Sequence, residues 1–190
     1  AGLDNGTHYV TDLNAFELND NTCVTLATEP HADDVQTGDV DSVRDFLQSG
    51  GNFFGQCAAI RRYEGGGTSS RLLTDTGLDN ENSGSGSILF DNPSDEVMQI
   101  EGGISNEGGS ISSFRIDASN TQTGSDSKRY AYFSNSNNKL YGGRISNVVP
   151  THGGYVYYLG GHKYEGSSTA SKNGRRVLPN AMLLAPTRPS

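Results

Sequence analysis

The chain has 190 residues, 33% of them hydrophobic, and its 22 acidic and 14 basic side chains give a formal net charge of −8. This length suits one core, so we expect a single α/β domain over residues 1–190 with a modest core and long polar loops. The negative charge argues against nucleic acid as a partner, and no apolar run approaches the roughly 20 residues of a membrane helix, so no membrane span is expected.

Residues 22–51 begin the clearest unit of the chain. Residues 23–27 are typical of a short buried strand, and Asp39 is placed to cap a following helix. The apolar residues of that helix recur at helical spacing: Val40, Val43, Phe46 and Leu47. The Gly-Gly step at 50–51 predicts where the helix ends.

The pattern continues through residue 64. Residues 52–57 predict a second strand, and residues 58–64 predict the start of another helix. Strand, helix, strand and helix in this order are typical of a parallel sheet with crossover connections. We therefore expect an α/β fold with a mainly parallel sheet flanked by helices.

A long stretch rich in Gly and Ser follows, and we interpret residues 65–125 as a β-rich insertion. Its strand candidates are residues 87–90, 96–100 and 111–116. Two better strands, rich in Tyr and β-branched residues, are predicted at residues 129–134 and 155–159. A last helix is predicted between Lys172 and Leu184, where Pro179 forces a kink or a late start.

Two segments resemble class I glutamine amidotransferase-like domains. In Val43–Ile60 a helix ends in a Gly-Gly step, a buried strand follows, and Cys57 lies at the turn into the next helix. Gly154–His162 is similar to the strand that delivers the catalytic histidine of that family. The resemblance implies Cys57 as nucleophile, His162 as its base and Glu165 as the group that orients the imidazole.

The chain departs from the family pattern at both segments. The family has Gly two residues after the Cys and Glu two residues after the His, where this chain has Ala59 and Tyr164. Residues 28–34 replace an early Gly-rich oxyanion loop. We therefore interpret the chain as a noncatalytic structural or binding module on an amidotransferase-like scaffold, with a cysteine-dependent hydrolase or amidotransferase as the alternative.

Composition also bears on location and partners. Few Lys residues and abundant Asn, Ser, Gly and Tyr are typical of exported proteins, so we expect an extracellular or cell-surface location. The expected partner is a protein or glycan surface, alone or within a larger assembly, and no cofactor is expected. The contact area would come from five tyrosines on predicted strands: Tyr130, Tyr132, Tyr155, Tyr157 and Tyr158. Packing of a sheet against a helix would account for tyrosines at these positions equally well.

Two oxygen-rich segments invite metal hypotheses. The residues Pro30-His31-Ala32-Asp33-Asp34 resemble a loop of zinc-dependent sugar de-N-acetylases, so a zinc-dependent deacetylase is a further alternative. No later His-x-x-His pair completes that site. Residues 79–84 alternate oxygen ligands as calcium loops do, but Phe90 at the twelfth position excludes an EF-hand. Solvated acidic turns are the expectation for both, so no metal site is predicted.

The two cysteines are predicted not to form a disulfide. If adjacent parallel strands carry them, Cys23 opens one strand and Cys57 closes the other, which leaves them about 15 Å apart. A disulfide needs Cα atoms within about 7 Å. We also expect Cys57 and His162 to meet at the carboxyl edge of the sheet, with the thiol largely covered and Glu165 not orienting the imidazole.

Overall fold

The computed structural model describes residues 25–28, 37–64, 79–81, 87–91, 94–105, 113–115, 128–145, 154–161 and 164–183. The strands are β1 (Thr25–Thr28), β2 (Asn52–Gln56), β3 (Asp79–Glu81), β4 (Ile88–Phe90), β5 (Ser113–Arg115), β6 (Lys128–Phe133), β7 (Ser136–Ile145) and β8 (Val156–Leu159). The helices are α1 (Thr37–Gln48), α2 (Ala58–Glu64), the short 3-10 helix η1 (Glu96–Met98) and α3 (Thr169–Met182).

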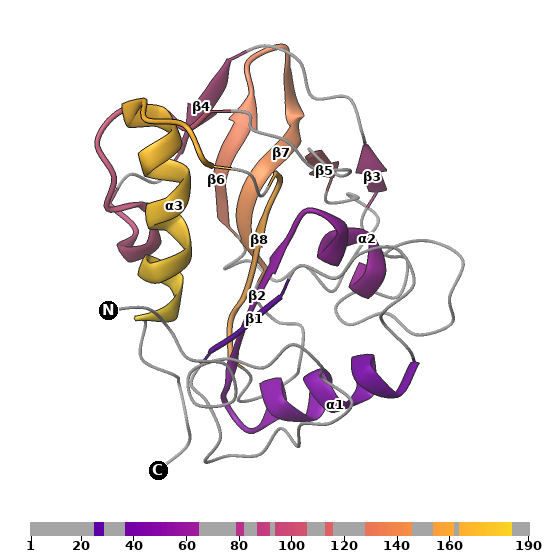
Figure 1. Ribbon diagram of the computed structural model, residues 1–190. Coiled ribbons are helices and arrows are strands. Elements are labelled where there is room, and N and C mark those ends of the chain that lie inside the picture. Colours follow the sequence, from indigo (N-terminus) through magenta and orange to yellow (C-terminus); the bar gives the residue numbers. More distant parts are fainter. Residues whose placement is uncertain are drawn as a thin grey trace.

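The described strands form one mixed sheet (Figure 1). One part is parallel: β2 lies between β1 and β8 and pairs in parallel with both. The other part is antiparallel: β7 pairs with β8, β6 and β5, while β4 pairs with β6 and β3 with β5. The fold is therefore α/β as predicted. A mainly parallel sheet is not confirmed, because β6 and β7 are joined by a short connection and strands joined in that way must run antiparallel.

Helix α1 follows its sequence pattern closely. Its predicted apolar positions are all buried: Val40, Val43, Phe46 and Leu47. The helix begins at Thr37, so Asp39 lies inside the first turn and the prediction that it caps the helix is wrong. At the other end Gly50 has a φ of 93°. The Gly50 and Gly51 amides donate to the carbonyls of Leu47 and Phe46, which is the Schellman arrangement expected of a glycine stop.

Helices cover both faces of the parallel part (Figure 1). On one face the Phe53 ring meets Tyr63 of α2 edge to face, with centroids 4.8 Å apart. The next residue, Phe54, points to the other face, where it shares a buried cluster with Val177 and Ala181 of α3. Because side chains alternate along a strand, β2 contributes to two cores at once.

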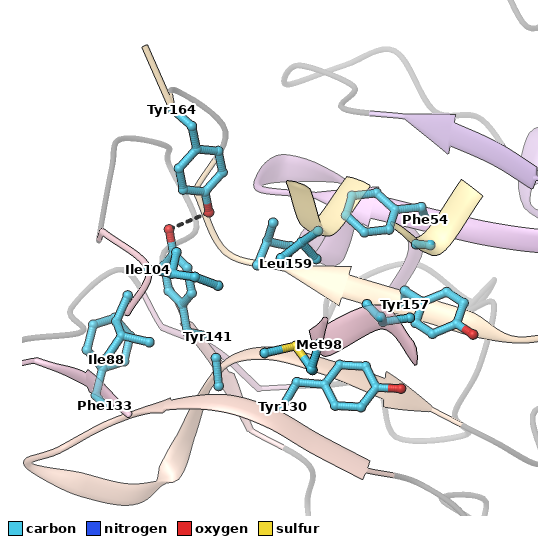
Figure 2. Close-up of a cluster of buried hydrophobic side chains, with 14 residues drawn as sticks. Phe54, Ile88, Met98, Ile104, Tyr130, Phe133, Tyr141, Tyr157, Leu159 and Tyr164 are labelled. Carbon is cyan, nitrogen blue, oxygen red and sulfur yellow. Dashed lines mark hydrogen bonds between the residues drawn. The ribbon is translucent and has the colours of Figure 1, made fainter. Parts of the chain in front are cut away.

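The second of these cores runs on into the antiparallel part (Figure 2). Phe133 and Tyr141 meet edge to face with centroids 5.7 Å apart, and Tyr130 stacks with Tyr157 of β8 at 6.4 Å. Aromatic pairs of this kind add to the burial of their area. The same cluster therefore joins β6, β7 and β8 to α3.

Four elements differ from the sequence prediction, the first being β3, whose residues were expected to form a solvated turn. Residues 96–100 are not a strand, because the Asp95 carboxylate accepts the Val97 amide at 3.2 Å and starts η1. Strand β7 was not predicted, since its sequence lacks regular alternation. Helix α3 begins at Thr169 behind the Ser168 cap, and Pro179 lies within its last turn.

Two further predictions concern larger features. Elements β3, β4, η1 and β5 fall within residues 65–125, and the interpretation of this range as an insertion stays a prediction. No helix in the described ranges combines the length and apolar character that a membrane span requires.

Candidate functional site

Cys57 lies at the turn between β2 and α2, and its backbone conformation is unusual. Its φ is 48°, in the left-handed region, and it is the one non-glycine residue with a positive φ in the described part of the chain. Its carbonyl accepts the Ile60 amide at 3.2 Å, so helix α2 starts directly from this residue. An L-amino acid in this conformation has its side chain crowded against the backbone, which costs about 1–2 kcal/mol.

The turn lies against the carboxyl end of β8. In the parallel ladder Gln56 is level with Leu159, and the Cys57 amide donates to the Leu159 carbonyl at 3.0 Å. Gly160 and Gly161 follow, both buried, and Gly161 has a φ of 70°. His162 is the next residue in the sequence and lies outside the described residues. The structure thus brings Cys57 beside the segment that precedes the predicted base.

The thiol of Cys57 is covered. Its relative exposure is 0%, and it forms no disulfide with any described residue. Cys23 lies outside the described residues, but Thr25, two positions later, pairs with Asn52 at the far end of β2. Five residues of strand separate Asn52 from Cys57, about 16 Å at the usual rise. Because Cys23 is not among the described residues, the absence of a disulfide between the two cysteines stays a prediction.

Glu165, the predicted orienting group, is exposed, whereas its neighbour Tyr164 is buried. The Tyr164 hydroxyl donates to the Gly160 carbonyl at 2.8 Å and lies 2.6 Å from the Tyr141 hydroxyl. Sequence reasoning missed this pair of tyrosines. The available signal was the tyrosine two residues after His162, at the position where the resembled family carries its carboxylate.

The described residues do not support either of the two metal-site hypotheses. The segment at 30–34 lies outside them, so the zinc alternative stays a prediction. Of the calcium candidate at 79–84, residues 79–81 form β3, which pairs with β5. Within the described ranges no group of three His, Cys, Asp or Glu side chains is placed to hold a metal ion.

The tyrosines predicted to form a binding surface are divided. Tyr130, Tyr157 and Tyr158 are buried, which matches the core-packing interpretation. Tyr132 and Tyr155 are partly exposed. The Arg129 guanidinium lies 3.8 Å from the centroid of the Tyr132 ring. The area available for contact is therefore smaller than the sequence suggests.

Comparison with known proteins leaves the site without a family. No protein-family model matches the chain, and no curated protein matches it significantly.

Proposed function

We propose that the chain is a cysteine-dependent acyl-transfer enzyme, either a hydrolase or an amidotransferase, with Cys57 as its nucleophile and His162 as its base. The observation that carries the proposal is the left-handed backbone of Cys57 at a strand-to-helix turn. Strained residues persist where the surrounding structure imposes them, and they cluster at active sites. A buried thiol serving only as an apolar side chain would gain nothing from this conformation.

The position of the turn supports the same proposal. A nucleophile elbow presents its side chain at the carboxyl edge of a sheet, where the parallel strands end. Cys57 follows the last residue of β2, and the Gly160–Gly161 step follows the last residue of the adjacent β8. This arrangement places the residue preceding His162 at the same edge as Cys57, as a nucleophile and base require.

The proposed reaction has two steps. The Cys57 sulfur attacks an acyl carbonyl after His162 takes its proton, and the proton passes to the leaving amine or alcohol as a thioester forms. Water, activated by the same base, then breaks the thioester and releases the acid. The cover over the thiol does not exclude this chemistry, because catalytic contacts often form only in the complex with substrate.

Alkylation tests the proposal. In a Cys23→Ser background, Cys57 is the remaining thiol, and its rate of reaction with iodoacetamide is followed against pH by mass spectrometry. We expect rapid labelling already below about pH 7, and its loss in His162→Ala. Labelling that rises only near about pH 8.5 in both proteins, as for an ordinary thiol, would contradict the proposal.

The cover over Cys57 favours a second candidate, the noncatalytic extracellular or cell-surface module. Its exposure of 0% and the exposed position of Glu165 are what a retained scaffold with lost chemistry would have. Such a module would contact a protein or glycan surface through the partly exposed Tyr132 and Tyr155. Labelling of Cys57 only under unfolding conditions would favour this candidate.

A further inference from the structure

Strand β4 lies beside β6 in the antiparallel part (Figure 1). Among the described strands it pairs with β6 alone. The Ser87 carbonyl accepts the Ser134 amide at 2.9 Å, and the Asp91 amide donates to the Tyr130 carbonyl at 2.8 Å. Because hydrogen-bonded and non-hydrogen-bonded pairs alternate along an antiparallel ladder, these two contacts fix which backbone groups of β4 face β6.

The backbone groups that face away from β6 belong to Ile88 and Phe90. The bonds to β6 lie at Ser87 and Asp91, and by alternation at Leu89, so the residues between them point their amides and carbonyls to the outer edge. The register of β4 with β6 has no shift, whereas that of β6 with β7 has several. The segment contains neither Lys nor Pro, which together with bulges commonly keep a sheet edge from pairing. Strand β4 thus presents a regular edge that can accept a further strand.

The side chains of β4 alternate between the core and an exposed face. Ile88 is 9% exposed and belongs to the buried cluster of Figure 2, and Phe90 packs against that cluster. Leu89 points to the opposite face and is 42% exposed. Its cross-strand partner on that face is the partly exposed Tyr132. An exposed leucine therefore lies directly beside the outer edge of the sheet.

We propose that the outer edge of β4 pairs with the same edge of a second copy of this chain, in antiparallel orientation and about a twofold axis at Leu89. The edge is self-complementary. With Leu89 of the two copies opposite each other, the amide and carbonyl of Ile88 meet the carbonyl and amide of Phe90 in the second copy. A twofold interface requires a surface of this kind, in which one patch matches itself.

The side chains near the axis fit the same arrangement. The two Leu89 side chains would form a non-hydrogen-bonded pair, with Cα atoms about 4.5 Å apart, and would cover each other from solvent. Asp91 would lie opposite Ser87 of the second copy, so no like charges meet, and its own charge is balanced by Arg129 at 2.5 Å. The contact would join two sheets into one, and it does not depend on the chemistry of Cys57.

Sedimentation equilibrium of the full chain tests the proposal. Strand β4 is 3 residues long, so the interface is smaller than the roughly 1,200 Å² of stable complexes, and we expect a dimer with a Kd on the order of 100 µM. Leu89→Lys and Leu89→Glu each place like charges opposite each other, so each variant alone should dimerise at least about tenfold more weakly. An equimolar mixture of the two places opposite charges at the axis and should restore the dimer. This restoration requires position 89 of one copy to face position 89 of the other.

Leu183→Lys is the matched control, because Leu183, just after α3, is an exposed leucine with a relative exposure of 84%. It should leave dimerisation unchanged. A second measurement places a cysteine at the axis. In a Cys23→Ser background Leu89→Cys should give a disulfide-linked dimer on mild oxidation, since the facing Cα atoms would lie within the limit of about 7 Å, whereas Leu183→Cys should not. This measurement also decides if the charged variants do not fold.

Four results would overturn the proposal. The first is a parent protein that stays monomeric up to about 1 mM, which would leave the edge to a strand from a different partner. The second is a dimer that Leu183→Lys weakens as much as Leu89→Lys does. The third is a mixture of the two charged variants in which no dimer returns, and the fourth is equal cross-linking through Leu89→Cys and Leu183→Cys.

Discussion

The parallel and antiparallel parts of the sheet are held together in different ways. In the parallel part backbones touch: a Cβ added at Gly154, just before β8, would lie 1.7 Å from the Gly51 carbonyl oxygen, and the Gly154 amide donates to the Leu47 carbonyl. Rings pack in both parts, as Phe53 with Tyr63 and Phe133 with Tyr141 do, but among the described glycines only Gly154 has backbone atoms this close to an added Cβ. Backbone contacts leave no room for adjustment, whereas side chains can shift. The parallel part, which carries Cys57, should therefore tolerate an added side-chain atom at this contact less well than the antiparallel part does.

The largest effect should come from Gly154→Ala. Its Cβ would meet backbone atoms that cannot move aside, so we expect a loss of about 3 kcal/mol in the free energy of unfolding, or failure to fold. Gly142→Ala is the matched change in the antiparallel part, where the nearest atom is a Leu159 methyl at 3.2 Å. Urea denaturation of both proteins measures the difference. Equal losses would remove the contrast between the two parts.

The second-largest loss of stability should come from Asn173→Asp on α3, the helix whose cluster joins the parallel and antiparallel parts. The Asn173 amide donates to the carbonyls of Glu101 and Gly103 at 2.6 and 2.9 Å, and the residue is fully buried. A carboxylate there would face two carbonyl oxygens, so we expect a loss of about 2 kcal/mol at neutral pH.

The loss in Asn173→Asp should depend on pH. Burial and the facing carbonyls raise the pKa of the introduced carboxyl above its unfolded value. The Arg176 guanidinium, 3.5 Å from the Asn173 Oδ1, acts in the opposite direction, but it is exposed and screened by solvent, so the rise is expected to prevail. The folded state therefore holds its proton more tightly, so stability is best retained below the unfolded pKa and is lost as pH rises through the folded pKa. Urea midpoints measured from acidic to neutral pH check the sign, and Asn173→Ala should lack this dependence.

A smaller effect is expected at Cys57, where the usual order of two substitutions should reverse. At most positions Ala is more stabilising than Gly, because Gly loses more chain entropy on folding. With a φ of 48°, Ala keeps the strain and Gly removes it, so we expect Cys57→Gly to be the more stable variant by about 1 kcal/mol. Thermal denaturation of the two proteins decides. If Cys57→Ala is the more stable, the strain argument for the site is lost.

The smallest effect should come from the surface of the antiparallel part. Arg129 pairs with Asp91 at 2.5 Å, and both side chains are about one-third exposed. Solvent screens such a pair, so Arg129→Ala should lose about 0.5 kcal/mol and less in high salt. Urea midpoints at two salt concentrations test this. A loss as large as that of Asn173→Asp would mean that the antiparallel part depends on its surface more than its packed rings suggest.

The sequence predicted the parallel part well because its signals are local. Helical spacing fixed α1, a glycine pair fixed its end, and Cys57 was expected at the turn where it lies. The antiparallel part was harder. Strand β7 has Gly142 and Gly143 in its second half and pairs through contacts with β6 and β8, which no local pattern contains. Glu96–Ile100 was predicted as a short strand, but a single capping residue, Asp95, favoured a helical turn.

The candidate site was predictable in part for the same reason. The position of Cys57 follows from a short stretch of strand, turn and helix. The Tyr141–Tyr164 contact joins residues 23 positions apart through the packing of α3, and single-sequence reasoning cannot reach such a contact. Whether Cys57 and His162 act together remains a prediction, since His162 lies outside the described residues.

The pairing of β2 with β8 has a consequence for how the chain folds. Asn52 accepts the amide of Tyr155 at 2.9 Å, and these partners are 103 positions apart in the sequence. Forming a contact between residues so far apart in the sequence costs loop-closure entropy before the contact stabilises the chain, so it slows folding. During synthesis, at roughly 5–20 residues per second, β2 has to wait on the order of 5–20 seconds for its partner. Over that interval the edge of β2 that later pairs with β8 is free to associate with other chains. A chaperone that binds the nascent chain would therefore limit aggregation during synthesis.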